Sequence, residues 1–163
     1  MANLTKWAAG NGVGFTWTTA INSADLASMA TGKTVLSSVA DIANQTNLDM
    51  YMDVSAVCAI ASSTIAAGAN LALWLYALQE DGSSYGDGQL TAGTPATATP
   101  VFPPCGIMPL LAAASQTALI GFVQGILIPP GSFRLAMQNN SGFTLTSGTQ
   151  AVKYRTYNIN LNG

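Results

Sequence analysis

Residues 116–163 read QTALIGFVQGILIPPGSFRLAMQNNSGFTLTSGTQAVKYRTYNINLNG, and this stretch decides the fold class of the chain. Apolar and polar residues alternate along it, and the alternation stops at Pro129-Pro130-Gly131, at Asn139-Asn140-Ser141-Gly142 and at Ser147-Gly148. Because prolines, glycines and asparagines mark turns, these interruptions predict four strands, over 116–128, 132–139, 143–147 and 151–161. A chain that ends in this way is expected to be all-β.

Strand-like patterns also occur upstream. In residues 48–60 the even-numbered positions are apolar, whereas Asp49 and Asp53 fall on the opposite face. Residues 69–79 form the next strand and are apolar on both faces, which predicts that this strand is sandwiched or faces a partner subunit. Shorter strands are expected at 15–18 and 33–38, and the N-cap pattern beginning at Asn22 predicts one or two helical turns between them. About eight antiparallel strands in one domain predict a jelly-roll-like β-sandwich.

Two segments do not fit the strand pattern. Residues 1–14 are rich in Gly and Asn and are expected to form an N-terminal arm ahead of a single domain over 15–163. Residues 80–115 contain five prolines and a Thr/Ala-rich stretch. A connection of this length is usually functional, and its composition favours an extended chain, so we expect it to lie across a neighbouring subunit.

The composition is unusual for a free monomer. Charged residues make up 7% of the chain, against about 25% in an average soluble domain, while hydrophobic residues make up 49%. Since surface charge keeps most monomers soluble, we expect other subunits to cover much of the surface, as in a homo-oligomer, a dimer or trimer. The net charge is −2 and the five basic residues are not clustered, so nucleic acid is not an expected partner.

The remaining features bear on location. No window resembles a membrane span, and the N-terminus lacks the charged and apolar regions of a secretory signal, so a cytosolic product without a membrane partner is expected. Cys58 lies in an apolar strand and is expected to be a small buried hydrophobe, while Cys105 lies in a loop. A disulfide between them would be unusual in the cytosol.

The chain offers little for catalysis. It has no histidine and no recognisable nucleophile or phosphate-binding motif, so we expect no enzyme, no catalytic residue, no metal and no cofactor. Asp49 and Asp53 would stand about 13 Å apart on one strand, which is too far for a catalytic pair, and they are interpreted as solvated carboxylates. The stretch 80–87 has oxygen ligands that suit calcium, but Asp-Gly turns explain it more simply.

The chain resembles the head decoration, or cement, proteins of tailed bacteriophages over roughly its last two thirds. The resemblance rests on the strand patterns within 48–79 and on turn and tail motifs. These motifs are Tyr85-Gly86-Asp87-Gly88, Ile128-Pro129-Pro130-Gly131-Ser132-Phe133, Gln138-Asn139-Asn140-Ser141-Gly142 and Tyr154-Arg155-Thr156-Tyr157-Asn158. It implies a jelly-roll-like sandwich that binds outside an expanded phage head, on the outer capsid surface of the virion, and braces neighbouring copies of the major capsid protein. It implies no catalytic residues.

The arm, the long loop and several aromatic side chains are the candidates for contact with the capsid or with another subunit. These residues are Trp7, Phe15, Trp17, Trp74, Tyr76, Pro103 and Pro104. The alternative is a jelly-roll module that recognises a receptor or glycan, for which Trp74 and Tyr76 are the one aromatic pair at suitable spacing on a strand.

Overall fold

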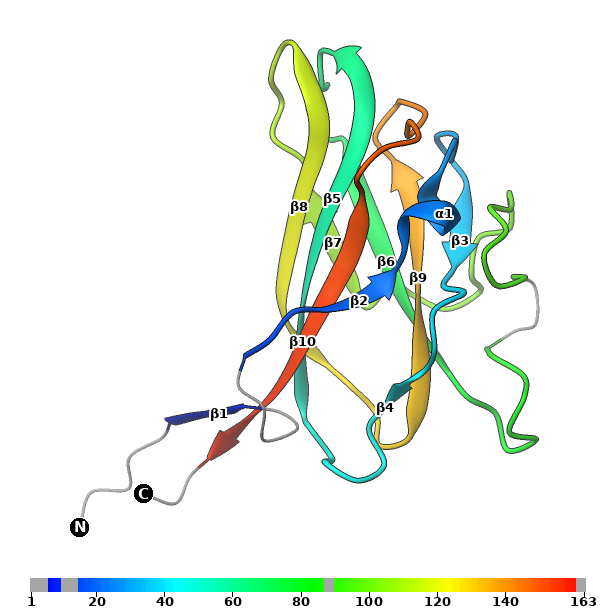
Figure 1. Ribbon diagram of the computed structural model, residues 1–163, viewed down its shortest axis with the longest axis vertical. Coiled ribbons are helices and arrows are strands. Elements are labelled where there is room, and N and C mark those ends of the chain that lie inside the picture. Colours follow the sequence, from blue (N-terminus) through cyan, green and yellow to red (C-terminus); the bar gives the residue numbers. More distant parts are fainter. Residues whose placement is uncertain (1–5, 10–14, 87–89, 161–163) are drawn as a thin grey trace.

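A computed structural model describes residues 6–9, 15–86 and 90–160 of the protein (Figure 1). It is built almost wholly from strands, which confirms the predicted all-β class. Five strands form the first sheet, here called sheet A, and five form the second, sheet B. Within the described ranges no helix has the length and apolar character needed to cross a membrane.

Sheet A has the order β1-β10-β5-β8, and β2 also pairs with β10. Its strands are β1 (Lys6–Ala9), β2 (Thr18–Ile21), β5 (Tyr51–Ser63), β8 (Gln116–Leu127) and β10 (Ala151–Asn160). Sheet B has the order β3-β9-β6-β7, and β4 also pairs with β9. Its strands are β3 (Thr34–Leu36), β4 (Ile42–Ala43), β6 (Asn70–Ala77), β7 (Gly106–Pro109) and β9 (Ser132–Asn140).

The strand pairs enclose one another along the chain, from β6 with β7 in the middle to β2 with β10 at the outside. β6 pairs with β7, β5 with β8, β3 and β4 with β9, and β2 with β10, always antiparallel. Such a pattern is one long hairpin whose successive pairs lie alternately in the two sheets, which is how a jelly roll is built. The predicted jelly-roll-like sandwich is therefore confirmed by the strand order.

The main core lies between the sheets and follows the alternation seen in the sequence. On β5 the even-numbered residues from Met52 to Ile60 are buried, as predicted. They pack with inward residues of sheet B such as Leu71, Leu73 and Leu135. Gly121 of β8 permits close packing here, because a Cβ at this position would lie only 2.8 Å from the Cβ of Met108.

One helical turn, α1 (Ser23–Leu26), links β2 to β3. The side chain of Asn22 caps it by accepting a hydrogen bond from the Asp25 amide at 3.0 Å, as the sequence predicted. Asp25 in turn accepts from the amide and hydroxyl of Ser38, at 2.8 and 2.6 Å. These bonds hold the β2–β3 connection against the edge of the sandwich.

Several predicted boundaries are wrong. Residues 143–147 form no strand and make only a single bridge, between Leu145 and Ile60. Residues 6–9 of the predicted arm form β1, paired with the end of β10, and the rest of the predicted arm lies outside the described residues. The predicted strand over 48–60 begins at Tyr51 instead, so Leu48 and Met50 are exposed.

The segment 80–115 also differs from its prediction. It contains β7, which pairs with β6, so part of it belongs to the sheet. Other residues of this segment pack on the outer face of sheet B of the same chain, where Leu90 is buried and Phe102 packs beside it. In Figure 1 the chain after β6 runs down and then back along the β3 and β9 side of the sandwich. These residues therefore pack on their own chain, and the expected contact of this segment with a neighbouring subunit stays a prediction.

Candidate functional site

The outer face of sheet A carries an aromatic and cationic cluster. The guanidinium carbon of Arg155, on β10, lies 4.9 Å from the ring centroid of Trp17 and 5.8 Å from that of Phe15. Trp17 also makes an edge-to-face contact with Phe122 of β8, with centroids 6.1 Å apart. Cation–π and edge-to-face contacts of these lengths are favourable, so three segments distant in sequence meet in one cluster.

Asp53 of β5 fixes the position of Arg155. Its carboxylate accepts hydrogen bonds from Nε and Nη2 of Arg155 at 3.0 and 2.8 Å. It also accepts from the Tyr157 hydroxyl at 3.0 Å and from the Gly125 amide at 3.1 Å. Asp53 is only 2% exposed, so its interpretation as a solvated carboxylate is wrong: the strand face that carries it is covered by these partners.

Burial raises the pKa of the Tyr157 phenol, and the hydrogen bond to Asp53 raises it further. The ring of Tyr157 stacks on that of Tyr51, with centroids 5.7 Å apart. The phenol therefore stays neutral and keeps donating to the carboxylate over the physiological pH range. The Asp53 carboxylate is therefore held by a neutral phenol on one oxygen and by the Arg155 guanidinium on the other.

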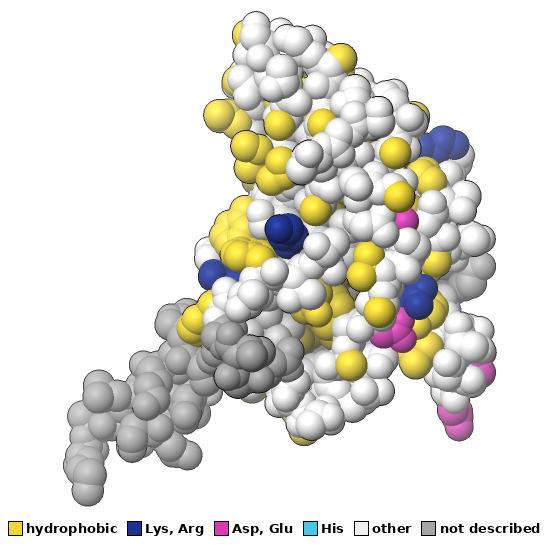
Figure 2. Space-filling model, in the orientation of Figure 1, with side chains coloured by type: hydrophobic (Ala, Val, Ile, Leu, Met, Phe, Trp, Pro, Cys, Tyr) yellow, Lys and Arg dark blue, Asp and Glu magenta, His cyan; other side chains and the backbone are white. Residues whose placement is uncertain are grey.

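Around the cluster, several outward positions of β5 and β8 are apolar and exposed. Val57 is 43% exposed, Phe122 44% and Ile120 68%, and Val57 lies directly opposite Ile120 in the sheet. Figure 2 shows apolar side chains gathered beside basic ones on the part of this face where β10 and β8 run. We call the outward-facing set the outer patch; its members are Phe15, Trp17, Val57, Ile120, Phe122 and Arg155.

Beside the outer patch is a hollow of about 340 Å³. Phe15, Gln124 and Arg155 line it, with Asp53 and Tyr157 at its base. The hollow is large enough for a side chain of a partner protein or for a small polar ligand. Its walls combine an aromatic ring with groups that can donate and accept hydrogen bonds.

Two of the predicted contact residues are buried within the chain. Trp74 is 4% exposed and Tyr76 1%, because both lie under the long loop. The indole of Trp74 donates to the carbonyl of Phe102 at 2.9 Å, and Tyr76 packs edge-to-face on the Phe102 ring. The two rings are therefore not the exposed pair that the receptor- or glycan-binding alternative requires, since they anchor the chain's own loop to sheet B.

The other predicted contact residues have mixed outcomes. Phe15 is 45% exposed and Trp17 is half-buried, both in the outer patch. Pro103 and Pro104 are exposed in the loop next to Phe102, which packs on the outer face of the other sheet, sheet B. Trp7 lies in β1, and its side chain lies outside the described structure. The predicted residues thus do not form one site, and their contact role stays a prediction.

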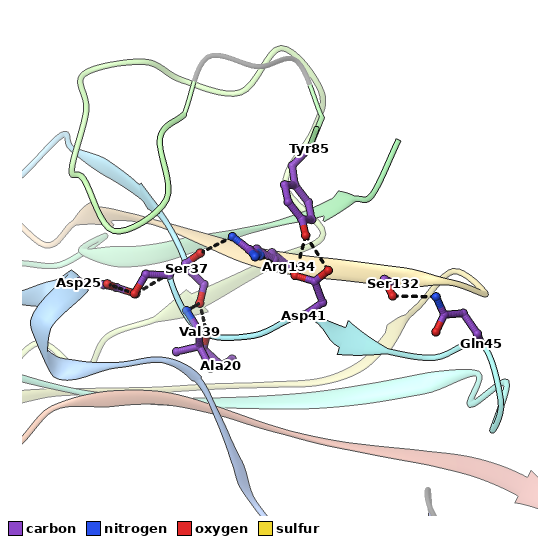
Figure 3. A network of polar contacts seen from close by, with 10 residues as sticks. Ala20, Asp25, Ser37, Val39, Asp41, Gln45, Tyr85, Ser132 and Arg134 are labelled. Atoms are coloured by element: carbon purple, nitrogen blue, oxygen red, sulfur yellow. Dashed lines mark hydrogen bonds and ion pairs between the residues drawn. The ribbon is translucent and has the colours of Figure 1, made fainter. Parts of the chain in front are cut away.

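A second polar network holds the loop in place (Figure 3). Asp41 accepts from Nε of Arg134 at 2.7 Å, and the Tyr85 hydroxyl donates to both carboxylate oxygens at 2.6 Å. The guanidinium of Arg134 also lies 4.4 Å from the centre of the Tyr85 ring. Burial alone would raise the pKa of Asp41, but the hydrogen bonds from Tyr85 and Arg134 outweigh it and hold that pKa below its usual value.

Other titratable groups serve structure. Asp49 is 4% exposed, which corrects its interpretation as solvated, and it accepts from the Asn158 side chain at 3.0 Å. Cys58 is buried as predicted, and burial raises its pKa to about 12, so it stays an inert thiol. Asp81 accepts from the amides of Ser83 and Ser84, which makes the predicted turn. Among the described residues no group of three metal-ligating side chains comes together.

Comparisons with known proteins add no relative: no family model, no curated protein and no solved structure matches the chain. The arrangement described above therefore stands on its own geometry.

Sequence reasoning missed the ion pairs that organise both networks. Arg155 and Asp53 are 102 residues apart, and Arg134 and Asp41 are 93 apart. One signal was available: Asp53, Arg134 and Arg155 fall within predicted strands of a chain with few charges, and charged side chains need partners when they are buried.

Proposed function

We propose that the protein is a structural virion component, a decoration or cement protein that binds the outside of an expanded phage head and braces neighbouring major capsid subunits. The observation that carries the proposal is the outer patch. It exposes three large apolar side chains on adjacent strands, Val57, Ile120 and Phe122, around a cation that is already neutralised by Asp53. An apolar surface of this kind is typical of a face that another protein covers.

The composition supports the same proposal. With only five basic and seven acidic residues, the protein has few charges to impose long-range repulsion or steering. A bracing protein stabilises a shell by mass action, because it binds the assembled lattice and not the separated subunits. Many copies act on one lattice, so modest contacts for each copy are sufficient.

The stability of the long loop bears on how such a clamp works. Its aromatic and ionic anchors, Trp74 to Phe102 and Tyr85 to Asp41, hold it on the sandwich before any partner is present. A surface that is already ordered loses less conformational entropy on binding than a flexible arm would. We assign the capsid contact first to the outer patch, because its apolar side chains are exposed. We assign it second to Pro103-Pro104, because this segment is exposed in a loop that is already ordered.

The test is co-sedimentation with expanded, undecorated heads of the phage that we propose as its source, followed by electron cryomicroscopy. We expect saturable binding at fixed lattice positions and heads that resist heat better. Phe15→Ser removes a 45%-exposed patch residue, and Ile107→Ser, 54% exposed on β7 of sheet B, is the matched control. A ring in an interface core contributes more than about 1 kcal/mol, so Phe15→Ser should weaken binding about tenfold while the control binds normally.

The second candidate is a receptor- or glycan-binding module. The hollow beside Phe15 favours it, because an aromatic wall with Gln124 and Arg155 is able to stack on and hydrogen-bond a sugar. Binding to host cell envelopes, with none to heads, would replace the cement proposal with this one. Equal binding of both serine variants to heads would refute the assignment of the contact to the outer patch.

A further inference from the structure

β8 is an unprotected edge strand. It runs for 12 residues, and within the described part of the chain its only strand partner is β5 (Figure 1, where β8 lies to the left of β5, on the side away from β10). Its sequence, QTALIGFVQGIL, contains no charged residue and no proline. Natural proteins block exposed edges with lysine, proline or short strands, because an open row of backbone groups pairs readily with another strand.

The edge of sheet B next to it is protected in the expected way. β7 has four residues and ends at Pro109, which has no N–H to donate. The contrast is within one molecule: one edge is short and carries a proline, while the neighbouring edge is long, uncharged and apolar. Such a difference indicates that β8 has a partner strand.

The backbone directions on β8 follow from bonds around β5. The carbonyl of Ala59 accepts from the Thr146 amide, on the β10 side of the sheet, and the carbonyl of Met50 accepts from the Ile128 amide, on the β8 side. In an antiparallel sheet the two backbone groups of a residue point to one side, and successive residues alternate. Even-numbered residues of β5 therefore bond to β8, and these lie opposite Leu119, Gly121 and Val123.

The intervening residues of β8 then point their N–H and C=O groups away from β5, toward solvent. They are Ala118, Ile120, Phe122 and Gln124. The same residues have outward side chains, since Ile120 lies opposite the exposed Val57. The free edge is thus one continuous segment ahead of the bulge near Gly125, where the pairing with β5 shifts register.

We propose that a second copy of this chain pairs with this edge, β8 against β8 in antiparallel register about a two-fold axis at Gly121. This register places Ile120 of one copy opposite Phe122 of the other, twice, and Ala118 opposite Gln124, twice. All four outward-pointing residues then lie in hydrogen-bonded pairs, each exchanging two backbone bonds. Aromatic and β-branched residues directly opposite each other are a favourable cross-strand pair.

The choice of a second copy as occupant rests on this self-complementarity. The outward segment is nearly palindromic in character, with two large apolar residues flanking a central glycine. It carries no charge, so two copies meet without like-charge repulsion. An isologous contact of this kind closes a dimer and leaves no edge for further growth.

The two-fold axis of a continuous antiparallel sheet is perpendicular to it, so both outer patches face the same side. The dimer would therefore present two copies of the Phe15, Trp17 and Arg155 cluster to one surface. That geometry suits bivalent attachment to a lattice. The pairing itself does not depend on the proposed cement function, since it concerns the purified protein alone.

The interface is small. A paired segment of about seven residues spans about 23 Å at 3.3 Å per residue. Its buried area falls below the roughly 1,200 Å² that marks weak complexes, so we expect a dimer with micromolar affinity. The association is therefore to be measured at about 200 µM protein as well as at low concentration.

The test is sedimentation equilibrium of the full chain and of two lysine variants. Ile120→Lys places a charge on the edge strand, and Val57→Lys places the same charge on the neighbouring, inner strand of the same face. We expect the wild type and Val57→Lys to sediment at twice the 16.7 kDa monomer mass at high concentration, and Ile120→Lys to remain monomeric. Loss of the dimer in both variants would indicate stacking of two sheet faces and would overturn edge pairing.

Hydrogen exchange provides an independent measurement that needs no substitution. The amides of Ile120 and Phe122 should exchange fast in dilute protein and become protected at about 200 µM, whereas Gly121 should be protected at both concentrations. A monomer at every concentration, or exchange at Ile120 and Phe122 that is independent of concentration, would overturn the proposal. Failure of head binding with an intact dimer would refute only the cement function.

Discussion

Asp53 is the buried carboxylate that holds Arg155 between two aromatic rings, and replacing it tests our account of the outer patch. Asp53→Asn keeps an oxygen that can accept from the Tyr157 hydroxyl and the Gly125 amide, but it removes the negative charge beside Arg155. Asp53→Ala removes the acceptor as well. The two variants therefore separate the ion pair from the neutral hydrogen bonds.

The expected magnitudes follow from burial. The Arg155 side chain is 28% exposed, whereas that of Asp53 is 3% exposed, so the pair lies between the surface and buried regimes. Surface ion pairs contribute about 0–1 kcal/mol to stability, and breaking a buried ion pair costs about 3–5 kcal/mol. We take a value between these ranges and expect Asp53→Asn to lower the unfolding free energy by about 2 kcal/mol. Asp53→Ala also leaves the buried Tyr157 hydroxyl without this acceptor, for a total of about 4 kcal/mol.

Urea unfolding followed by tryptophan fluorescence measures both losses, and thermal melts should show a decrease of about 6 °C for Asp53→Asn. Glu80→Gln is the control for charge removal, because Glu80 is exposed, and it should stay within about 0.5 kcal/mol of wild type. The reasoning is refuted if Asp53→Ala is no worse than Asp53→Asn, or if neither variant differs from the control.

Three further predictions concern stability. Trp74→Ala should lower the unfolding free energy by about 3–5 kcal/mol and speed proteolysis within residues 80–105, because the ring and its hydrogen bond to Phe102 anchor the loop. An unchanged cleavage rate would contradict this prediction. Gly121→Ala should lower the unfolding free energy, measured with denaturant, by about 1–3 kcal/mol, because the added Cβ would clash with Met108 of β7. An unchanged unfolding free energy would show that β7 shifts to make room for it. Burial raises the pKa of both thiols and of three tyrosines, so the unfolding free energy should begin to fall above about pH 9, where unfolded thiols ionise, and fall more steeply above about pH 10, where unfolded phenols ionise while the folded ones keep their protons. A flat stability profile to pH 12 would be inconsistent with the raised pKa values of Tyr85, Tyr154 and Tyr157.

The sequence alone determined the long strands. Residues 116–128, 132–139 and 151–161 were predicted within a few residues of β8, β9 and β10, because alternation over many positions and turn residues at the ends are local properties. The same alternation identified the buried side of β5. Short strands such as β4 and β7 were missed, since two to four residues carry no readable period and exist only through pairing with β9 and β6.

Only the tertiary structure decided what covers each face. The apolar residues on both faces of β6 correctly predicted that other residues pack on its outer face. That these residues belong to the chain's own loop depends on contacts between Trp74 and Phe102, which are 28 residues apart. Likewise, Asp53 is buried because Arg155 and Tyr157 reach it from a strand about a hundred residues later. The alternation of apolar and polar residues predicts which face of a strand is buried. What packs on that face is determined by the order of the strands in the sheets, and no local sequence pattern predicts that order.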